Sequence, residues 1–550
     1  TYSTNAAGTE YKASYGINNG LSGNLIFESA FIFHRDFFEW EVGVSNLTGG
    51  NVELGDLALP LPMNTAFSSP SSSVFKHSFV SGHGSFIFWM RPNSVGPYLL
   101  MTPTGDTWLE YWDRLNGGYE VYIHSKAEGA VAAAQGTQWR QPNTSLLLGP
   151  GESQRYGFKF QWADGYDGVR QALVNEGKLD VHVVPGMTVP TNLFARVALR
   201  TTQTINSITA EFPDETQIQS LGNRGDYAIY EVRFSRLGEN LLTVNYGDNH
   251  KTCLEFFVTE PIETLIRKRS AFIANHQVVD PTKWYDGLLC EWNMSSGVLL
   301  TPDNYDLISG FRIYAVTCDD PGLSHPAYLA SKQALYPVQS EVNAMDYYLE
   351  NFVWGGLQRT TNETFAYGVY GIPDWFQNRN SSNPGSGGQL HLWRIYDYPH
   401  VVVMYLNMYR VAKNYPHIST ALTANEYLRR AYGTAVALYT IPLAIAGWSA
   451  YETGLMNERV VVELIAELEA NGWTAEASTL RNHWEQKVDH FVNQNPDLYG
   501  SEYAFDSTGF ETTHEIAKYA TQYARTNAGI SMSNALLFLE QQMAANLVVR

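Results

Sequence analysis

Acidic residues directly follow an aromatic residue at three positions in the second half of the chain. The pairs are Tyr396-Asp397, Tyr451-Glu452 and Phe510-Glu511, and their acids are 55 and 59 residues apart. Carboxyl groups of this kind can donate or accept protons in catalysis. Each pair stands before an apolar stretch with helical character, where the helix dipole favours a carboxylate. The spacing therefore predicts three acids at one rim of a helical domain.

The step between these acids suggests how the helices are arranged. Two helices of about 20 residues with their loops account for such a step. Helical hairpins repeated at this interval would return the chain to the same end of a toroid each time. Pro399 supports the first boundary, because proline suits the opening turn of a helix. The simplest alternative is that each acid only caps a helix.

Aromatic, basic and polar residues surround the three acids in the sequence. Tryptophan and tyrosine rings offer flat apolar faces with polar edges, which suit sugar rings. The candidates for substrate binding are Asp374, Trp375, Trp393, Arg394, Trp448, Tyr451 and His514.

The elements that must position these residues change in character near residue 263. From about residue 23 to 258, short runs rich in Val, Ile, Phe, Tyr and Thr alternate with turn clusters, which predicts antiparallel strands. A brief helix-like segment, Gly165 to Gly177, interrupts them. We therefore predict a large β-sandwich over 1–178, a smaller immunoglobulin-like β domain over 179–262, a linker helix and loops over 263–336, and an (α/α) toroid over 337–550.

Several helical signals define the second half. Thr423 to Glu426 is a capping box, whose helix is expected to run to about Tyr439. The stretches from Val401 to Ala412 and from Ala435 to Ala446 are apolar nearly all round, which predicts burial on every side. Four residues share one helical face at steps of four, four and three, namely Leu480, Trp484, Val488 and Phe491. The predicted fold is thus a β-sandwich region followed by an (α/α) toroid.

Composition excludes several classes of function. The 550 residues carry a formal net charge of −19, which argues against nucleic-acid and anionic-membrane partners and mildly against strongly anionic polysaccharides. No apolar run approaches the ~20 residues of a membrane span. We find no phosphate loop, dinucleotide glycine fingerprint, His-Glu-x-x-His motif or nucleophile elbow. No zinc or iron–sulfur spacing is present, and neither a metal nor a cofactor is expected.

Five sequons and three cysteines bear on localisation. The sequons are at Asn46, Asn143, Asn293, Asn362 and Asn380, in polar or turn-like contexts. They predict a secreted, extracellular glycoprotein, numbered after removal of a signal peptide. Cys253, Cys290 and Cys318 allow at most one internal disulfide.

The order of predicted domains resembles that of several inverting glycoside hydrolase families, including the glucoamylase-like and glycosyl phosphorylase-like groups. The segments from Gly447 to Gly454 and from Phe505 to Glu515 also look like a family of secreted fungal and bacterial proteins of unknown function. The resemblance covers most of the chain as architecture, and no catalytic motif of a characterised family matches residue by residue.

The resemblance implies hydrolysis of a plant or microbial cell-wall polysaccharide or oligosaccharide by two carboxyl groups. One gives its proton to the leaving oxygen, and the other activates water on the opposite face of the sugar. Under this hypothesis Glu452 is the acid and Glu511 the base, with Asp397 the competitor for either role. The resemblance also implies that the three tryptophans stack on sugars, and that Arg394 and His514 hold hydroxyl groups or tune a carboxylate.

Two alternatives remain open. A polysaccharide lyase would abstract a proton next to a uronate carboxylate with Tyr or His, and neutralise that carboxylate with Arg or Lys. Known toroidal lyases usually place the helical domain before the sandwich, which counts against it. A carbohydrate-binding protein without catalysis would keep the aromatic stacking sites but lack a close carboxyl pair.

The last helical pattern, from about Ser533, reaches Arg550 without a terminating Gly or Pro. A six-hairpin toroid at the observed step needs about 340 residues, whereas Glu263 to Arg550 supplies 288. We therefore expect either fewer hairpins or a separate C-terminal fragment of the same precursor.

Overall fold

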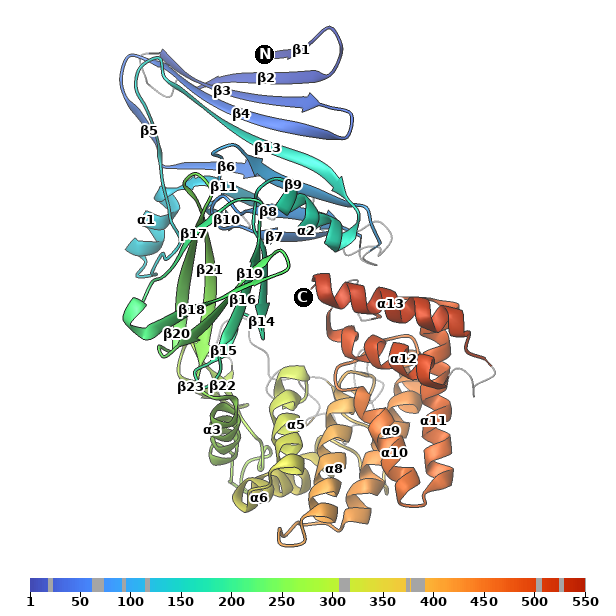
Figure 1. Cartoon of the computed structure of the whole chain (residues 1–550). Helices are drawn as coiled ribbons and strands as arrows, with labels where there is room; N and C mark the ends of the chain where they lie inside the picture. The colour runs from blue at the N-terminus through green and yellow to red at the C-terminus, as the bar shows by residue number, and fades with distance from the viewer. Residues whose placement is uncertain are drawn as a thin grey trace. The chain divides into compact units, whose positions relative to one another are not determined.

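The computed structural model describes residues 1–17, 23–61, 74–91, 95–113, 119–305, 317–371, 376, 391–500, 507–523 and 529–549. The chain divides into two compact units, one of Thr1–Ile262 together with Leu547–Arg550, the other of Glu263–Asn546. The division falls where the sequence changes character. Figure 1 shows sheets in the first half of the chain and helices in the second, as predicted.

The first unit contains an eight-stranded antiparallel sheet in the order β1-β2-β3-β4-β13-β9-β8-β7. Its strands are β1 (Tyr2–Thr4), β2 (Glu10–Ile17), β3 (Gly23–Phe33), β4 (Phe37–Thr48), β7 (Phe75–Phe79), β8 (Phe86–Met90), β9 (Tyr98–Thr104) and β13 (Ser153–Ala163). Phe38 of β4 lies opposite Phe160 of β13, with ring centroids 4.6 Å apart. Such cross-strand aromatic pairs set the register, because a slip of one residue would turn them to the other face.

Smaller elements complete this β region. They are β5 (Val52–Leu54), β6 (Asp56–Pro60), β10 (Tyr111–Asp113), β11 (Glu120–Ser125), β12 (Leu146–Leu148), α1 (Lys126–Ala134) and α2 (Gly165–Asn175). The predicted helix near Gly165 is confirmed as α2. Helix α1 was not predicted, although its alanine-rich sequence has high helix propensity.

Two four-stranded sheets follow, in the orders β14-β16-β19-β18 and β15-β21-β20-β17. Their elements are β14 (Asp180–Val184), β15 (Thr188–Pro190), β16 (Ala195–Arg200), β17 (Ile205–Ala210), the 3-10 turn Pro213–Glu215, β18 (Thr216–Arg224), β19 (Tyr227–Phe234), β20 (Gly238–Tyr246) and β21 (His250–Thr259). Alternate residues such as Val197, Val232 and Phe256 form a shared buried core. The strands are antiparallel except that β15 runs parallel to β21, which corrects the prediction of purely antiparallel strands.

The second unit is mainly helical. It contains α3 (Ile262–Asn275), α5 (Asp320–Leu335), α6 (Gln339–Tyr348), α8 (Asp397–Asn414), α9 (Ala424–Ala446), α10 (Arg459–Ala470), α11 (Thr474–Asp489), α12 (Phe510–Tyr523) and α13 (Met532–Val549). Shorter elements are β22 (Glu291–Asn293), β23 (Val298–Leu300), the π-helical turns Leu349–Val353 and His490–Gln494, and the 3-10 turn Ser507–Gly509. Helix α8 packs against both α5 and α9. The six-hairpin ring remains a prediction.

The structure confirms two of the local helical predictions in this unit and corrects one helix end. Thr423 and Glu426 form the predicted capping box. Helix α9 does not end near Tyr439, because it continues through Pro442 to Ala446 and stops at Gly447, whose φ is 68°. Glycine tolerates this left-handed conformation, so it ends the helix where a proline inside did not. Leu480, Trp484, Val488 and Phe491 are all buried, as their spacing predicts.

Candidate functional site

Two of the three predicted rim acids lie at the start of a helix. Asp397 is the first residue of α8, and Glu511 lies in the first turn of α12. Glu452 is exposed in the turn-rich segment after α9, whereas α10 begins only at Arg459. The predicted placement of Glu452 at a helix N-terminus is therefore wrong, because residues after Gly447 form turns rather than a helical continuation.

Glu511 faces the N-terminus of α10. Its Oε2 accepts a hydrogen bond from the backbone amide of Asn457 at 2.9 Å. Burial raises the pKa of Glu511, while the backbone amides of Asn457 and Arg459 oppose that rise. The carboxyl group lines a cavity of about 760 Å³ that also contains Arg410 and Glu463. Glu511 thus caps a neighbouring helix, which is the simpler alternative given above.

Asp397 lies in a buried cluster of acids around one arginine. Arg394 forms an ion pair with Asp319, with Nε 2.9 Å and one terminal nitrogen 2.8 Å from Asp319 Oδ1. Its Nε also lies 3.5 Å from Oδ1 of Asp397, which is fully buried. Asp319 is the N-cap of α5 and accepts the backbone N–H of Asp320. Helices α5 and α8 thereby bring these acids together.

The electrostatics of this cluster disfavour the ionised form of Asp397. Burial raises the pKa of Asp397 well above its usual range; Arg394 opposes the rise, and Asp319 and Asp320 add to it. Burial also lowers the pKa of His400 to about 4. His400 is therefore neutral near pH 7, and its Nε2 lies 4.0 Å from Asp320 Oδ1.

Oxygen atoms of Asp319, Asp320 and Asp397 all lie within 4.8 Å of one another. Carboxylate oxygens are the donors that hard divalent cations prefer. The sequence predicted no metal, because the residues that form this group come from separate helices and match no ligand spacing.

An aromatic cluster adjoins the acids. The rings of Trp393 and Trp448 are stacked, with centroids 5.5 Å apart and planes at 25°. Tyr396 meets Trp448 edge to face at 5.9 Å. Both tryptophans are half-buried, so part of each ring faces solvent. The structure thus brings the predicted platform residues Trp393 and Trp448 together beside Arg394.

Tyr451 forms a hydrogen-bonded pair with His483 of α11. Its hydroxyl oxygen lies 2.7 Å from His483 Nδ1, and both side chains are partly exposed. Tyr439 stacks on the imidazole with a centroid distance of 5.1 Å. Burial raises the pKa of Tyr451 and lowers that of His483. Sequence reasoning missed His483, because nothing in its local pattern distinguishes it from other polar residues of α11.

Glu458 is a buried acid that the sequence did not single out. Glu458 and Lys487 form an ion pair of 2.6 Å in which both side chains are fully buried. Thr512 donates a further hydrogen bond of 2.8 Å to Glu458. The pair ties α10, α11 and α12 together and has no exposure to solvent, which suits a structural role.

The remaining predicted site residues are dispersed. His514 contacts Gln542 of α13, with Nδ1 3.1 Å from Oε1. Asp374 and Trp375 lie outside the described residues, as does the sequon residue Asn380.

The other sequons differ in accessibility. Asn143 and Asn362 are exposed, and Asn293 is half-buried and accepts hydrogen bonds from Ser296. Asn46 is fully buried, and its amide nitrogen donates to the carbonyl oxygens of Gly50, Leu148 and Gly149. The folded chain has no space for a glycan at Asn46.

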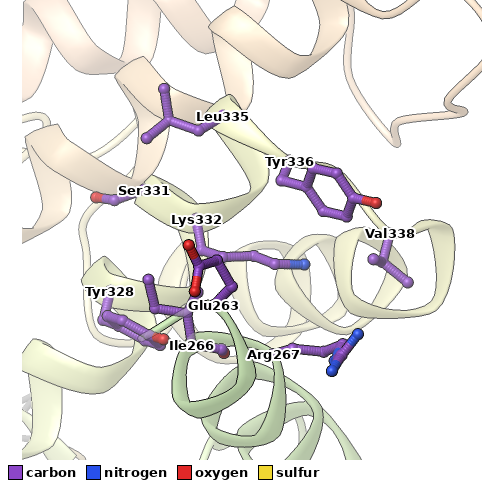
Figure 2. Close-up of a pocket in the computed structure, with 9 residues that line it drawn as sticks. All are labelled: Glu263, Ile266, Arg267, Tyr328, Ser331, Lys332, Leu335, Tyr336 and Val338. Atoms are coloured by element: carbon purple, nitrogen blue, oxygen red, sulfur yellow. Dashed lines mark hydrogen bonds between the residues drawn. The ribbon is translucent and has the colours of Figure 1, made fainter. Parts of the chain in front are cut away.

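An apolar pocket of about 640 Å³ lies between α3 and α5. Figure 2 shows Ile266 and Arg267 of α3 on one side and Tyr328 and Lys332 of α5 on the other. Lys332 is held by Glu341 at 2.6 Å. The pocket contains none of the predicted site residues, so we place the candidate site at the acid and aromatic clusters.

The helices of the described ranges include none with the length and apolar character of a membrane span. Within those same ranges the three cysteines are buried and none of them forms a disulfide.

Comparison with solved structures shows a shared fold in one case, described first. A protein described as a polysaccharide lyase matches with a TM-score of 0.70 at 18% identity, over 99% of this chain and 71% of its own. A galactose mutarotase related enzyme from Lactobacillus acidophilus covers 30% of this chain and 73% of its own, with 10% identity and a TM-score of 0.19. An alpha-galactosidase from Lactobacillus brevis covers 35% and 29%, with 9% identity and a TM-score of 0.20.

No curated protein matches the chain. A family model, described as a family of unknown function, matches residues 11–537, which is nearly the whole chain. This protein therefore belongs to the family of unknown function DUF5695.

Proposed function

We propose that this protein is a carbohydrate-active enzyme of the polysaccharide lyase class, acting on a uronate-containing polysaccharide. The observation that carries the proposal is the hydrogen-bonded pair of Tyr451 and His483. Tyr451 follows Trp448 by three residues in the chain. The likeness in fold to a protein described as a polysaccharide lyase supports it. Because that likeness extends over 99% of this chain, the predicted order of domains no longer counts against a lyase.

The pair supplies the proton transfers that elimination needs. Tyr451 Oη would take the proton from the carbon next to the uronate carboxylate, while its own proton passes to His483 Nδ1. The bond from the neighbouring ring carbon to the leaving oxygen then breaks, and a carbon–carbon double bond forms. The proton returns through Tyr451 to the leaving oxygen, so no net charge is left on the enzyme.

The shifts in pKa fit this relay. The raised pKa of Tyr451 disfavours a free phenolate, so the tyrosine needs a base at hand. The lowered pKa of His483 keeps its imidazole neutral near pH 7, in the form that accepts a proton. A positioned acid–base group of this kind contributes roughly 10²–10⁴-fold to a rate.

Neighbouring residues would bind the polysaccharide. Trp393 and Trp448 are stacked and half-buried, which suits contact with the apolar faces of sugars. Arg394 is a positively charged residue beside Trp393 that would attract the uronate carboxylate, although it already pairs with Asp319. Asp374, Trp375 and His514 remain proposals as binding residues, as do secretion and glycosylation at the exposed sequons.

The inverting hydrolase hypothesis has less support. Its two carboxyl groups should lie about 6.5–9.5 Å apart to leave room for water. Oxygen atoms of Asp319, Asp320 and Asp397 lie within 4.8 Å of one another, which is closer than the spacing that an inverting hydrolase needs. Glu511 caps α10, and Glu452 is not among the residues that line its cavity.

The test is an assay with uronate-containing and neutral polysaccharides that follows ultraviolet absorbance and reducing ends together. A lyase produces both signals from the uronate polymer, because each cleavage leaves an unsaturated product. Reducing ends without absorbance would support the hydrolase, and binding without products would support a carbohydrate-binding protein. Tyr451→Phe should abolish the absorbance, while the control Tyr336→Phe, at a residue 72% exposed on another surface, should not.

A further inference from the structure

The acid cluster of α5 and α8 has the composition of a cation site. We propose that Asp319, Asp320 and Asp397 bind a divalent metal ion, with Ca²⁺ as the preferred ion. The proposal goes beyond the proposed function, because it concerns binding and not the reaction.

The geometry of the donors is the first argument. One oxygen from each carboxylate lies within 4.8 Å of the others. Ca²⁺ takes oxygen ligands at about 2.3–2.6 Å, so it can bridge oxygens up to about 5 Å apart. Mg²⁺ takes ligands at about 2.0–2.1 Å, so it spans oxygens only up to about 4.2 Å apart and fits a cluster of this width less well.

The second, independent argument is that the buried side chain of Asp397 lacks hydrogen bonds within the part of the chain that the structure describes. Its side chain is fully buried, yet neither carboxylate oxygen has a hydrogen-bond partner among the described residues. The 3.5 Å ion pair with Arg394 reaches only Oδ1. A buried carboxylate without hydrogen bonds is unfavourable, so native proteins normally satisfy such a group. A metal ion in contact with Oδ2 would do so.

Charge balance is the third argument. The cluster holds three carboxyl groups and one guanidinium, that of Arg394. The guanidinium binds Asp319 through Oδ1, which also accepts the amide of Asp320. The acids of the cluster therefore outnumber its cations, and one divalent ion would supply the charge that balances all three carboxylates.

The backbone of Gly371 also approaches the cluster. A Cβ atom at this position would lie 2.7 Å from Asp397 Oδ2 and 2.4 Å from Arg394 Cβ. Only glycine allows the chain to pass so near the carboxylate, which is one of the recognised uses of glycine at a ligand site.

The experiment uses the whole chain after treatment with a chelator and its removal. Titration with CaCl₂ in a calorimeter should give one binding event per chain, and thermal unfolding should move to higher temperature as CaCl₂ is added. MgCl₂ at the same concentration should produce a smaller shift. Absence of both binding heat and a thermal shift with CaCl₂ would overturn the proposal.

Variants assign the binding to these residues. Asp397→Asn should lose at least tenfold in Ca²⁺ affinity, whereas Asp303→Asn, at a carboxylate that is 54% exposed elsewhere in the unit, should keep the parent affinity. If Asp397→Asn fails to fold, Asp320→Asn decides, since that side chain is 26% exposed. If the folded variant used for this test binds Ca²⁺ with the affinity of the parent, the proposal is overturned. None of these measurements needs a polysaccharide, so failure of the lyase assay would leave their result standing.

Discussion

The hydroxyl oxygen of Tyr451 lies 2.7 Å from Nδ1 of His483, although 32 positions separate the two residues in the chain. Tyr439 stacks on the same imidazole at 5.1 Å, with the two planes 1° apart, and so fixes its orientation. A tyrosine held against a neutral histidine is suited to pass a proton in either direction.

Replacing His483 tests this relay. His483→Gln keeps a polar group near Tyr451 but removes the base, so we expect the rate of elimination to fall by roughly 10²–10⁴-fold. Burial lowers the pKa of His483, so the parent enzyme should stay active below the usual histidine range and lose activity only as pH falls further. The measurement is initial rate against pH by ultraviolet absorbance. The relay is contradicted if the variant retains both the parent rate and the parent acidic limb.

The buried pair of Glu458 and Lys487 should contribute strongly to stability. Lys487→Met leaves a carboxylate buried without its partner, which typically costs about 3–5 kcal/mol of unfolding free energy. Urea denaturation followed by far-ultraviolet circular dichroism measures this loss. Lys126→Met is the matched control, because Lys126 pairs with Glu53 at an exposed position and should cost less than about 1 kcal/mol. A similar midpoint for both variants would contradict the structural role.

Asp346 should make the free energy of unfolding depend on pH. Burial raises the pKa of Asp346 to about 6 from an ordinary value of 3.8, while Tyr427 and the amide of Ala421 oppose the rise. Since the folded pKa is the higher one, the contribution to stability is complete below pH 3.8 and is lost as pH rises through about 6.

Asp346→Asn removes this titration. Its unfolding free energy should therefore vary less than that of the parent between pH 4 and pH 6, by an amount on the order of 2–3 kcal/mol. Chemical denaturation at several pH values makes the comparison. Parallel pH profiles for the variant and the parent would refute the assignment.

Gly371 should tolerate no side chain. Gly371→Ala places a methyl group against Asp397 and Arg394, so we expect a loss of about 1–3 kcal/mol in stability from overpacking. Gly50→Ala is the control, since an added Cβ there meets nothing within 4 Å. Thermal unfolding compares the two variants. Equal melting temperatures would show that the chain can shift away from Asp397 at little cost.

Much of the fold follows from local patterns in the sequence. The capping box at Thr423 and the buried face of Leu480 and Trp484 were predicted correctly, because hydrogen bonds within one turn and the helical period decide them. The end of α9 was predicted less well. The helix was expected to run to about Tyr439, but it continues through Pro442 to Ala446 and ends at Gly447, whose φ is 68°.

Local composition and spacing thus predict the change from strands to helices near residue 263 and the presence of acids and aromatic rings in the helical half. Which of these residues contact one another depends on the packing of the helices. Arg394 reaches Asp319 across 75 positions and Tyr451 reaches His483 across 32, because packing of α5 on α8 and of α9 on α11 brings them together. Contacts of this kind depend on how separate helices pack, which no local spacing encodes.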